Sequence, residues 1–164
     1  MQARLRHAYL FTVIAVALTT VLGETSFAQP NNPFVGIWKL NVAKSTYSPG
    51  PAPQSSTTQI ELVSAGLKYT VDQVTATGGK QHWEFSGNYD GRDNLVAGDN
   101  PNGDTVALIR VNDTTVRQVN KKNGRVTVTQ VAVVSSDGKT RTLTTTGINL
   151  EGQTVNNVAV YEKQ

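Results

Sequence analysis

The sequence predicts an all-β protein, an antiparallel up-and-down meander of 8–10 strands closed into a barrel. From Phe34 onward Val and Thr dominate, and apolar residues recur at every second position, which is typical of strands. Turn dipeptides such as Asp90-Gly91, Asn102-Gly103 and Asn123-Gly124 separate these runs and favour hairpins. No segment beyond position 28 repeats apolar residues at helical spacing over three turns. The sequence therefore offers no crossover helices for a parallel sheet.

The N-terminal part of the chain has the features of a secretory signal peptide over 1–28. Two arginines precede an apolar run of 13 residues, Leu10 to Leu22, and Ser26-Phe27-Ala28 supplies the small residues of a cleavage site. As a helix that run is about 20 Å long, which is short of the ~30 Å hydrocarbon core, so we expect cleavage and no stable membrane insertion. The predicted location is periplasmic or extracellular.

The remaining segment, 29–164, has the size of a single domain and a net charge of +2. It contains no cysteine, which excludes a disulfide framework and a thiolate metal site. Because the charge is small and not clustered, we expect no nucleic-acid partner. No cofactor is expected, and we expect a monomer.

The first half of the domain contains four clear strand runs and a short, weakly patterned one. Apolar and polar residues alternate in each, and glycine-containing turns at 64–66, 77–79 and 90–91 separate the later ones. These runs are 34–40, 57–63, 66–74, 80–87 and a short one near 93–97.

The second half contains five strand runs with equally regular spacing. A turn dipeptide separates each run from the next. These dipeptides are Asn112-Asp113, Asn123-Gly124, Asp137-Gly138 and Glu151-Gly152. The runs are 104–111, 114–120, 125–135, 139–148 and 153–162. Since a long open meander would expose two hydrogen-bonding edges, we expect the first and last strands to pair.

One connection differs from the hairpins. Between the first two strands lies 41–56, and its proline-rich centre at 48–53 has too few backbone donors for a strand and cannot form a helix. We expect an extended, polyproline-like strap. It would either shield the side or end of the barrel or act as a lid over a cavity mouth.

The string Asn32-Pro33-Phe34-Val35-Gly36-Ile37-Trp38-Lys39-Leu40 contains a G-x-W at the start of the first strand. Followed by an all-β meander, it resembles the calycins, the lipocalin and fatty-acid-binding barrels. Together with the proline-rich segment it is similar to secreted bacterial lipocalin-like proteins of uncharacterised function. The resemblance implies that Trp38 plugs the closed end and that Gly36 permits close backbone approach. It also implies an arginine over Trp38, for which the chain offers Lys163 on the last strand and Arg141 one strand earlier.

The tetrapeptide His82-Trp83-Glu84-Phe85 is the main candidate for chemistry. Alternation along a strand places His82 and Glu84 on one face and the two aromatics on the other. With the aromatics inside, the imidazole and carboxylate lie in water. The inverse register would bury a His/Glu pair suited to polar recognition, general base work or haem ligation.

Hydrophobic alternation also predicts which residues face the interior. Among them we expect four to contact a ligand, namely Tyr69, Trp83, Phe85 and Leu108. The inward sets are Ile60 and Leu62; Leu67, Tyr69 and Val71; Trp83 and Phe85; Val106 and Leu108; Val126 and Val128; Val158 and Val160.

The acidic stretch 99–104, with Asp90 and Asp93 before it, offers oxygen ligands that Ca²⁺ accepts. It lacks the alternating carboxylates and final Glu of an EF-hand loop, and its residues are those of ordinary hairpin loops. We therefore predict a solvated loop and no metal site.

Three functions remain open on this sequence. The first is non-catalytic binding of a small hydrophobic or amphipathic molecule in the barrel, the second a ligand-free structural or interaction module of the cell envelope. The third, an enzyme, would centre on His82, the one histidine after position 28, although the chain has no G-x-S-x-G elbow or phosphate-binding glycine motif. We expect no catalysis.

Overall fold

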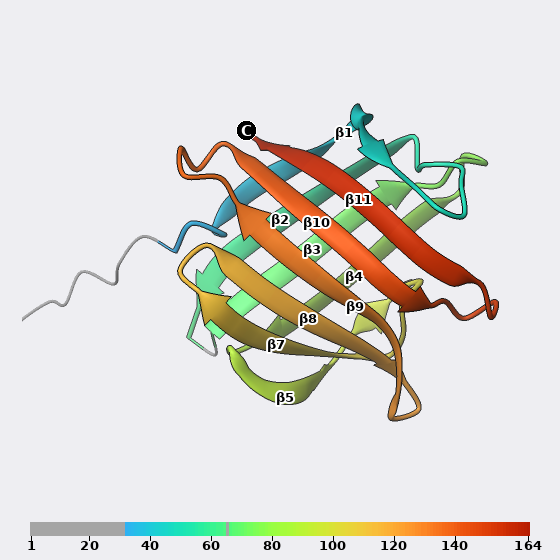
Figure 1. Cartoon of the computed structure of the whole chain (residues 1–164). Coiled ribbons are helices and arrows are strands. Elements are labelled where there is room, and N and C mark those ends of the chain that lie inside the picture. The colour runs from blue at the N-terminus through green and yellow to red at the C-terminus, as the bar shows by residue number, and fades with distance from the viewer. Residues whose placement is uncertain (1–31, 65) are drawn as a thin grey trace, which may run out of the picture.

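Strands β1 (Gly36–Thr46) and β11 (Thr154–Lys163) come from opposite ends of the chain and pair antiparallel in the computed structural model (Figure 1). Trp38 lies opposite Lys163 in this pair. The pairing joins the first and last strands, which would be the edges of an open meander.

The structure describes residues 32–64 and 66–164. Eleven strands in this part form one antiparallel sheet, in the order β5-β7-β8-β9-β10-β11-β1-β2-β3-β4-β6, and it curls into a nearly closed barrel. The predicted all-β fold is thereby confirmed. The other strands are β2 (Ser55–Val63), β3 (Gly66–Val74), β4 (Lys80–Gly87), β5 (Asp90–Leu95), β6 (Ala97–Gly98), β7 (Thr105–Asn112), β8 (Thr115–Lys122), β9 (Arg125–Val134) and β10 (Thr140–Ile148).

The stretch 90–98, where one short strand near 93–97 was predicted, changes partner partway along. Its first part, β5, pairs with β7, and its last part, β6, pairs with β4 through Trp83 opposite Gly98. Only Val96 separates the two. The two ends of the sheet are therefore adjacent in sequence, and this stretch joins them.

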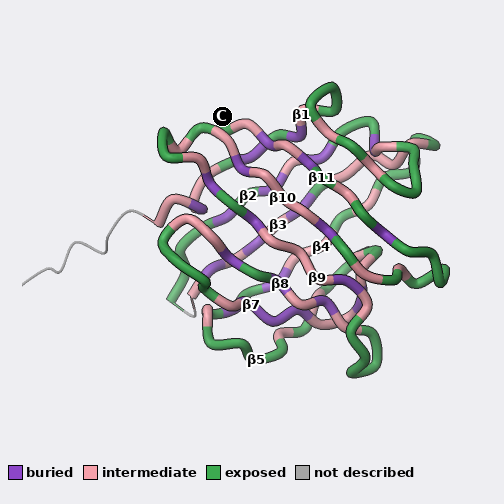
Figure 2. Tube along the Cα trace, viewed as in Figure 1, coloured by how far each residue is buried: buried purple, intermediate pink, exposed green. Residues whose placement is uncertain are grey.

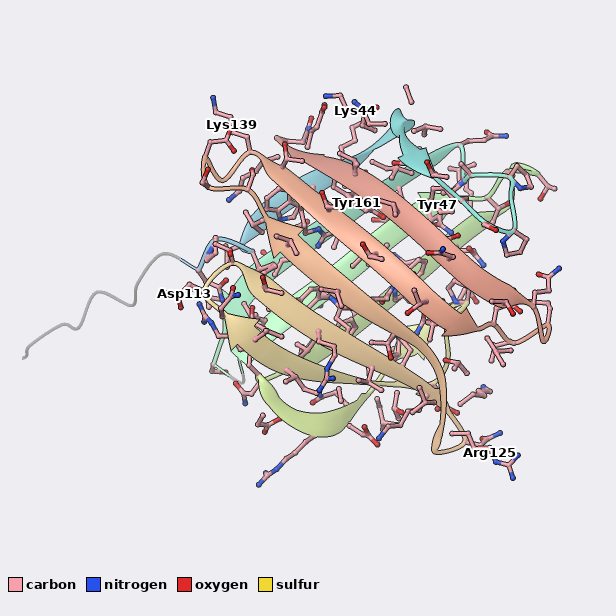
Figure 3. The ribbon with its side chains drawn as sticks, in the orientation of Figure 1. Lys44, Tyr47, Asp113, Arg125, Lys139 and Tyr161 are labelled. Carbon is pink, nitrogen blue, oxygen red and sulfur yellow. The ribbon has the colours of Figure 1, made fainter. Side chains whose placement is uncertain are left out.

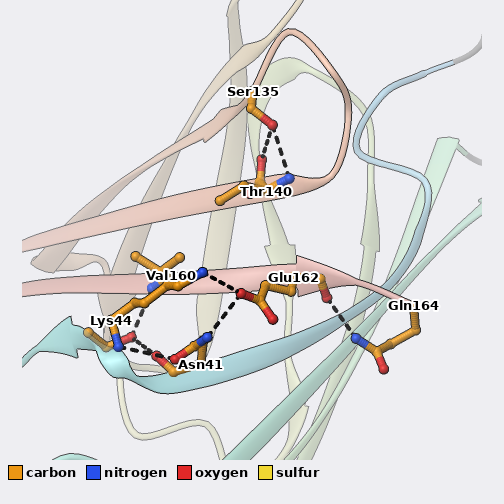
Figure 4. A network of polar contacts seen from close by, with 8 residues as sticks. Asn41, Lys44, Ser135, Thr140, Val160, Glu162 and Gln164 are labelled. Atoms are coloured by element: carbon orange, nitrogen blue, oxygen red, sulfur yellow. Dashed lines mark hydrogen bonds and ion pairs between the residues drawn. The ribbon is translucent and has the colours of Figure 1, made fainter.

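The proline-rich strap is shorter than predicted. The first strand does not end at residue 40 but runs on to Thr46, with an irregularity between Asn41 and Thr46 where it follows β11. Glu162 of β11 accepts hydrogen bonds from Asn41 Nδ2 and Lys44 Nζ, both at 2.9 Å, and these bonds tie the irregular segment to its neighbour (Figure 4). The strap is consequently 47–54 rather than 41–56.

Burial alternates along the strands, as Figure 2 shows. Most of the predicted inward residues are buried, but five are exposed or only half-buried: Leu62, Trp83, Val126, Val158 and Val160. Leu62 and Val126 lie near hairpin ends. In β11 the face is reversed, because Tyr161 lies opposite the buried Leu40 and so points inward.

The expected signal peptide, 1–28, lies outside the described residues. Within those residues, no helix is long and apolar enough to cross a membrane.

Candidate functional site

The barrel contains a cavity of about 310 Å³. This volume is at the lower end of the range of about 300 to 1,000 Å³ that is typical of small-molecule pockets. Side chains from most of the sheet and from three connections line it. The residues that line it include Tyr47, Pro49, Pro51, Pro53, Ser56, Tyr69, Trp83, Phe85, Asn100, Pro101, Asn102, Gln118, Asn120, Gln130, Arg141, Thr145 and Tyr161.

One wall of the cavity is aromatic and comes from β3 and β4. Tyr69 lies opposite Phe85 in the strand pair, and their rings stack with centroids 4.7 Å apart and planes 9° from parallel. Trp83, two positions before Phe85 on the same face, is half-buried and also lines the cavity. Three of the four predicted ligand-contacting residues thus meet at one wall. The fourth, Leu108, is fully buried in the core but does not line the cavity.

His82 and Glu84 point to the outside of the barrel. His82 Nδ1 lies 2.7 Å from Asp72 Oδ1, and both side chains are more than half exposed. Glu84 pairs with Lys68 at 2.7 Å, which lowers the pKa of the Glu84 carboxyl and raises that of the Lys68 ammonium. Of the two registers considered for this strand, the structure has the one with the aromatics inside.

The wall made by β8, β9 and β10 is polar, which hydrophobic alternation did not predict. Asn120 Nδ2 donates to Gln130 Oε1 at 3.1 Å, and Gln130 Nε2 donates to Thr145 Oγ1 at 3.3 Å. Gln118 is buried beside them. In Figure 1 these strands lie in front of β3 and β4, so the cavity has an aromatic side and an amide side.

Trp38, near the start of β1, is completely buried. Its indole Nε1 donates to the backbone carbonyl of Phe34 at 2.8 Å. Lys163 Nζ lies 5.0 Å from the Trp38 ring centroid, and its side chain occupies the space where a Cβ on Gly36 would lie, so Gly36 leaves room for it.

Arg141 extends into the floor of the cavity from β10. Its guanidinium carbon lies 5.6 Å from the Trp38 ring centroid and 4.6 Å from that of Tyr161, within the range of cation–π contacts. The residue is 2% exposed. The sequence offered Lys163 and Arg141 as the cation over Trp38. In the structure both lie against its ring, Lys163 exposed to solvent and Arg141 buried.

The Arg141 guanidinium has no acidic partner among the described residues, and its Nε has no hydrogen-bond acceptor. Burial lowers its pKa, while Tyr161 and Tyr69 act in the opposite direction. The Tyr69 hydroxyl is also buried; it lies beside the Tyr89 hydroxyl without a hydrogen bond of standard geometry, and burial raises its pKa well above the ordinary value. Both groups are hydrogen-bond donors at neutral pH.

The strap and the loop 100–102 line part of the cavity. Tyr47, labelled with Tyr161 in Figure 3, follows the end of β1 and lines the cavity with three prolines of the strap. The strap is fixed to β11, since Asn156 N donates to Ser48 O at 2.7 Å and Ser48 N donates to Asn157 Oδ1 at 2.8 Å.

The acidic loop holds no metal cluster in the part of the chain that is described, where no three His, Asp or Glu side chains gather. Asp104 instead accepts a hydrogen bond from Asn123 N and pairs with Lys122. No family model, curated protein or solved structure matches the chain.

Proposed function

We propose that this protein is an exported, lipocalin-like barrel that binds one small amphipathic molecule in its interior and performs no reaction on it. The observation that carries the proposal is the cavity with unlike walls, one of stacked aromatic rings and one of amides and hydroxyls. A molecule with an apolar and a polar side fits such a lining better than a pure hydrocarbon, which would leave buried amide groups without partners.

Two features of the sequence support export and the lipocalin-like assignment. The basic start, apolar run and small cleavage residues within 1–28 are those of a secretory signal peptide. The G-x-W of Gly36 and Trp38 stands at the beginning of the first strand, and Trp38 is completely buried. His82, the candidate centre of an enzyme, lies on the outer face in a solvent-exposed pair with Asp72.

Native mass spectrometry of protein purified from its own host tests the proposal. We expect a species heavier than the polypeptide by the mass of one small molecule, which organic solvent removes. The emptied protein should then bind the neutral fluorescent probe N-phenyl-1-naphthylamine at about one site per chain. A bare polypeptide mass together with no probe binding contradicts the proposal and favours the ligand-free envelope module.

A further inference from the structure

We propose that the molecule bound in the barrel is a neutral saccharide, and that its hydroxyl groups bind to a row of uncharged polar side chains on β8, β9, β10 and β11. This inference rests on the proposed function and names the chemical class of the ligand. Its basis is the register of these four strands, together with an amide group that is buried at the cavity without a protein partner.

The polar row crosses four neighbouring strands on the inner face of the barrel. The register places Gln118 opposite Gln130, and Gln130 opposite Thr145. It also places Thr145 opposite Asn157. All four side chains line the cavity. Since neighbouring strands lie about 4.8 Å apart, the row is about 14 Å long and offers polar groups to several hydroxyls at once.

Gln118 supplies the free amide of this row. Its side chain is 8% exposed and forms no hydrogen bond within the described residues. A buried amide without a partner is unfavourable, because it has lost its hydrogen bonds to water. Its N–H groups therefore lack an acceptor and its carbonyl oxygen lacks a donor, and a ligand in the cavity can supply both.

The neighbouring side chains leave further polar groups free. Gln130 accepts a hydrogen bond from Asn120 and donates one to Thr145 Oγ1. The Thr145 hydroxyl proton and Asn120 Oδ1 then have no partner within the part of the chain that is described. Donors and acceptors are thus mixed along the row. A sugar hydroxyl is both a donor and an acceptor, so adjacent hydroxyls match this row better than an acceptor-only or a donor-only group does.

Charge favours a neutral ligand at this row. Among the described residues, no carboxylate side chain lines the cavity, so a cationic ligand would have no counter-ion there. The one lysine or arginine in the same lining, Arg141, lies four residues before Thr145 on β10, which is about 13 Å along the strand. An anionic group at the level of Thr145 would therefore also be buried without a counter-ion.

The aromatic wall suits the other side of a sugar. Tyr69 and Phe85 are stacked there, and Trp83 lies on the same face of β4 as Phe85. The C–H groups of a pyranose ring form an apolar face that packs against aromatic rings. A saccharide can therefore use the aromatic wall and the polar row together, whereas a hydrocarbon chain can use only the first.

Calorimetric titration of the emptied mature protein with phenyl glycosides tests this assignment. Phenyl β-glucoside, phenyl β-galactoside and phenyl α-mannoside are the neutral saccharides. Anisole carries the same phenyl ether without the sugar, and phenyl β-glucuronide differs from the glucoside by one carboxylate. We expect at least one neutral glycoside to bind at one site per chain, about 10-fold or more tightly than anisole, since it adds several hydrogen bonds. The glucuronide should bind no more tightly than the glucoside.

Gln118→Met locates the hydroxyl-binding row, because Met is also unbranched but lacks the amide. It should weaken binding of the tightest glycoside about 3- to 10-fold, as the loss of one or two neutral hydrogen bonds does, and leave anisole binding within about two-fold. Gln59→Met, the same substitution on the exposed outer face of β2, is the matched control and should change neither. Circular dichroism verifies folding. If Gln118→Met does not fold, the comparison of the compounds on the wild type decides alone.

Failure of the inference is distinguishable from failure of the proposed function. If no neutral glycoside binds more tightly than anisole, or if the preference for the glycoside is unchanged in folded Gln118→Met, the saccharide assignment is wrong and the cavity remains a binding site. Tighter binding of the glucuronide than of the glucoside overturns it in favour of an anionic ligand. If none of these compounds binds, and neither N-phenyl-1-naphthylamine nor a co-purified molecule is bound, the proposed function itself fails.

Discussion

The guanidinium of Arg141 lies over the ring of Trp38, with 5.6 Å between its central carbon and the ring centroid. This contact links the start of β1 to the lining of the cavity. Trp38 already has a hydrogen-bond partner in the backbone of Phe34, whereas the Nε of Arg141 has none. The two residues should therefore have opposite roles in the stability of the empty protein, Trp38 raising it and Arg141 lowering it.

Replacing Trp38 tests the first of these roles. Because the indole is completely buried, Trp38→Ala should lower the free energy of unfolding by about 3–5 kcal/mol, as large aromatic truncations in cores do. Chemical denaturation followed by circular dichroism measures the change. An unfolding midpoint close to that of the wild type would show that the ring contributes little to the core.

Trp83→Ala should weaken binding of N-phenyl-1-naphthylamine, since Trp83 lines the cavity from the aromatic wall. Loss of one aromatic contact of about 1 to 3 kcal/mol corresponds to a roughly 5- to 100-fold increase in Kd. Fluorescence titration measures the Kd, on protein shown to be folded by circular dichroism.

His82→Ala is the matched control, because the neighbouring side chain points to the opposite face of the same strand. Its Kd should equal that of the wild type. The reverse result, with binding lost in His82→Ala and retained in Trp83→Ala, would place the site outside the barrel.

The junction between β4 and β6 depends on Gly98. Its φ is +91°, and a Cβ there would collide with the backbone carbonyl of His82. Gly98→Ala should therefore destabilise the protein by more than about 1 kcal/mol and loosen this seam. Hydrogen exchange at the Asp99 amide, which donates to His82 O, should become faster than in the wild type.

Gly124→Ala separates the collision from the cost of a positive φ. Gly124 also has a positive φ of 75°, but nothing lies within 4 Å of its missing Cβ. It should lose less stability than Gly98→Ala and leave exchange at Asp99 unchanged. Equal losses in the two variants would mean that backbone conformation alone sets the requirement for glycine at Gly98.

The seam between β1 and β11 should be acid-sensitive. Lys44 and Asn41 lower the pKa of the Glu162 carboxyl, so its contribution to stability is present above the ordinary carboxyl pKa and is lost as pH falls through the lower, folded-state value. Denaturation curves from pH 6 to pH 2 should show a smaller pH dependence for Glu162→Gln than for the wild type. Glu151→Gln is the control: Glu151 lies in an exposed turn and has no hydrogen bond or ion pair within the described residues, so this variant should keep the wild-type pH dependence.

The strands could be predicted from the sequence because alternation and turn dipeptides are local signals. The register of β11 could not, since Val158 and Val160 compete with Val155 and Tyr161 for the inner face and only pairing with Leu40 decides between them. The aromatic wall followed from alternation in β4. The amide wall did not, because the predicted inward sets contained apolar and aromatic residues only. Whether a polar strand face such as that of Gln118 encloses a cavity depends on distant strands.

Arg141 itself should reduce the stability of the empty protein. Its charge is buried without an anionic partner, and replacing buried charges by apolar groups of similar volume is often neutral or stabilising by about 1–4 kcal/mol. Arg141→Met loses the two ring contacts, but Met keeps most of the apolar volume of the side chain. We expect the free energy of unfolding of delipidated Arg141→Met to equal or exceed that of the wild type. Chemical denaturation of both proteins measures the change, with Arg117→Met, on the exposed outer face of β8, as the control. A loss of more than about 2 kcal/mol in the delipidated variant would instead make Arg141 part of the structural plug over Trp38.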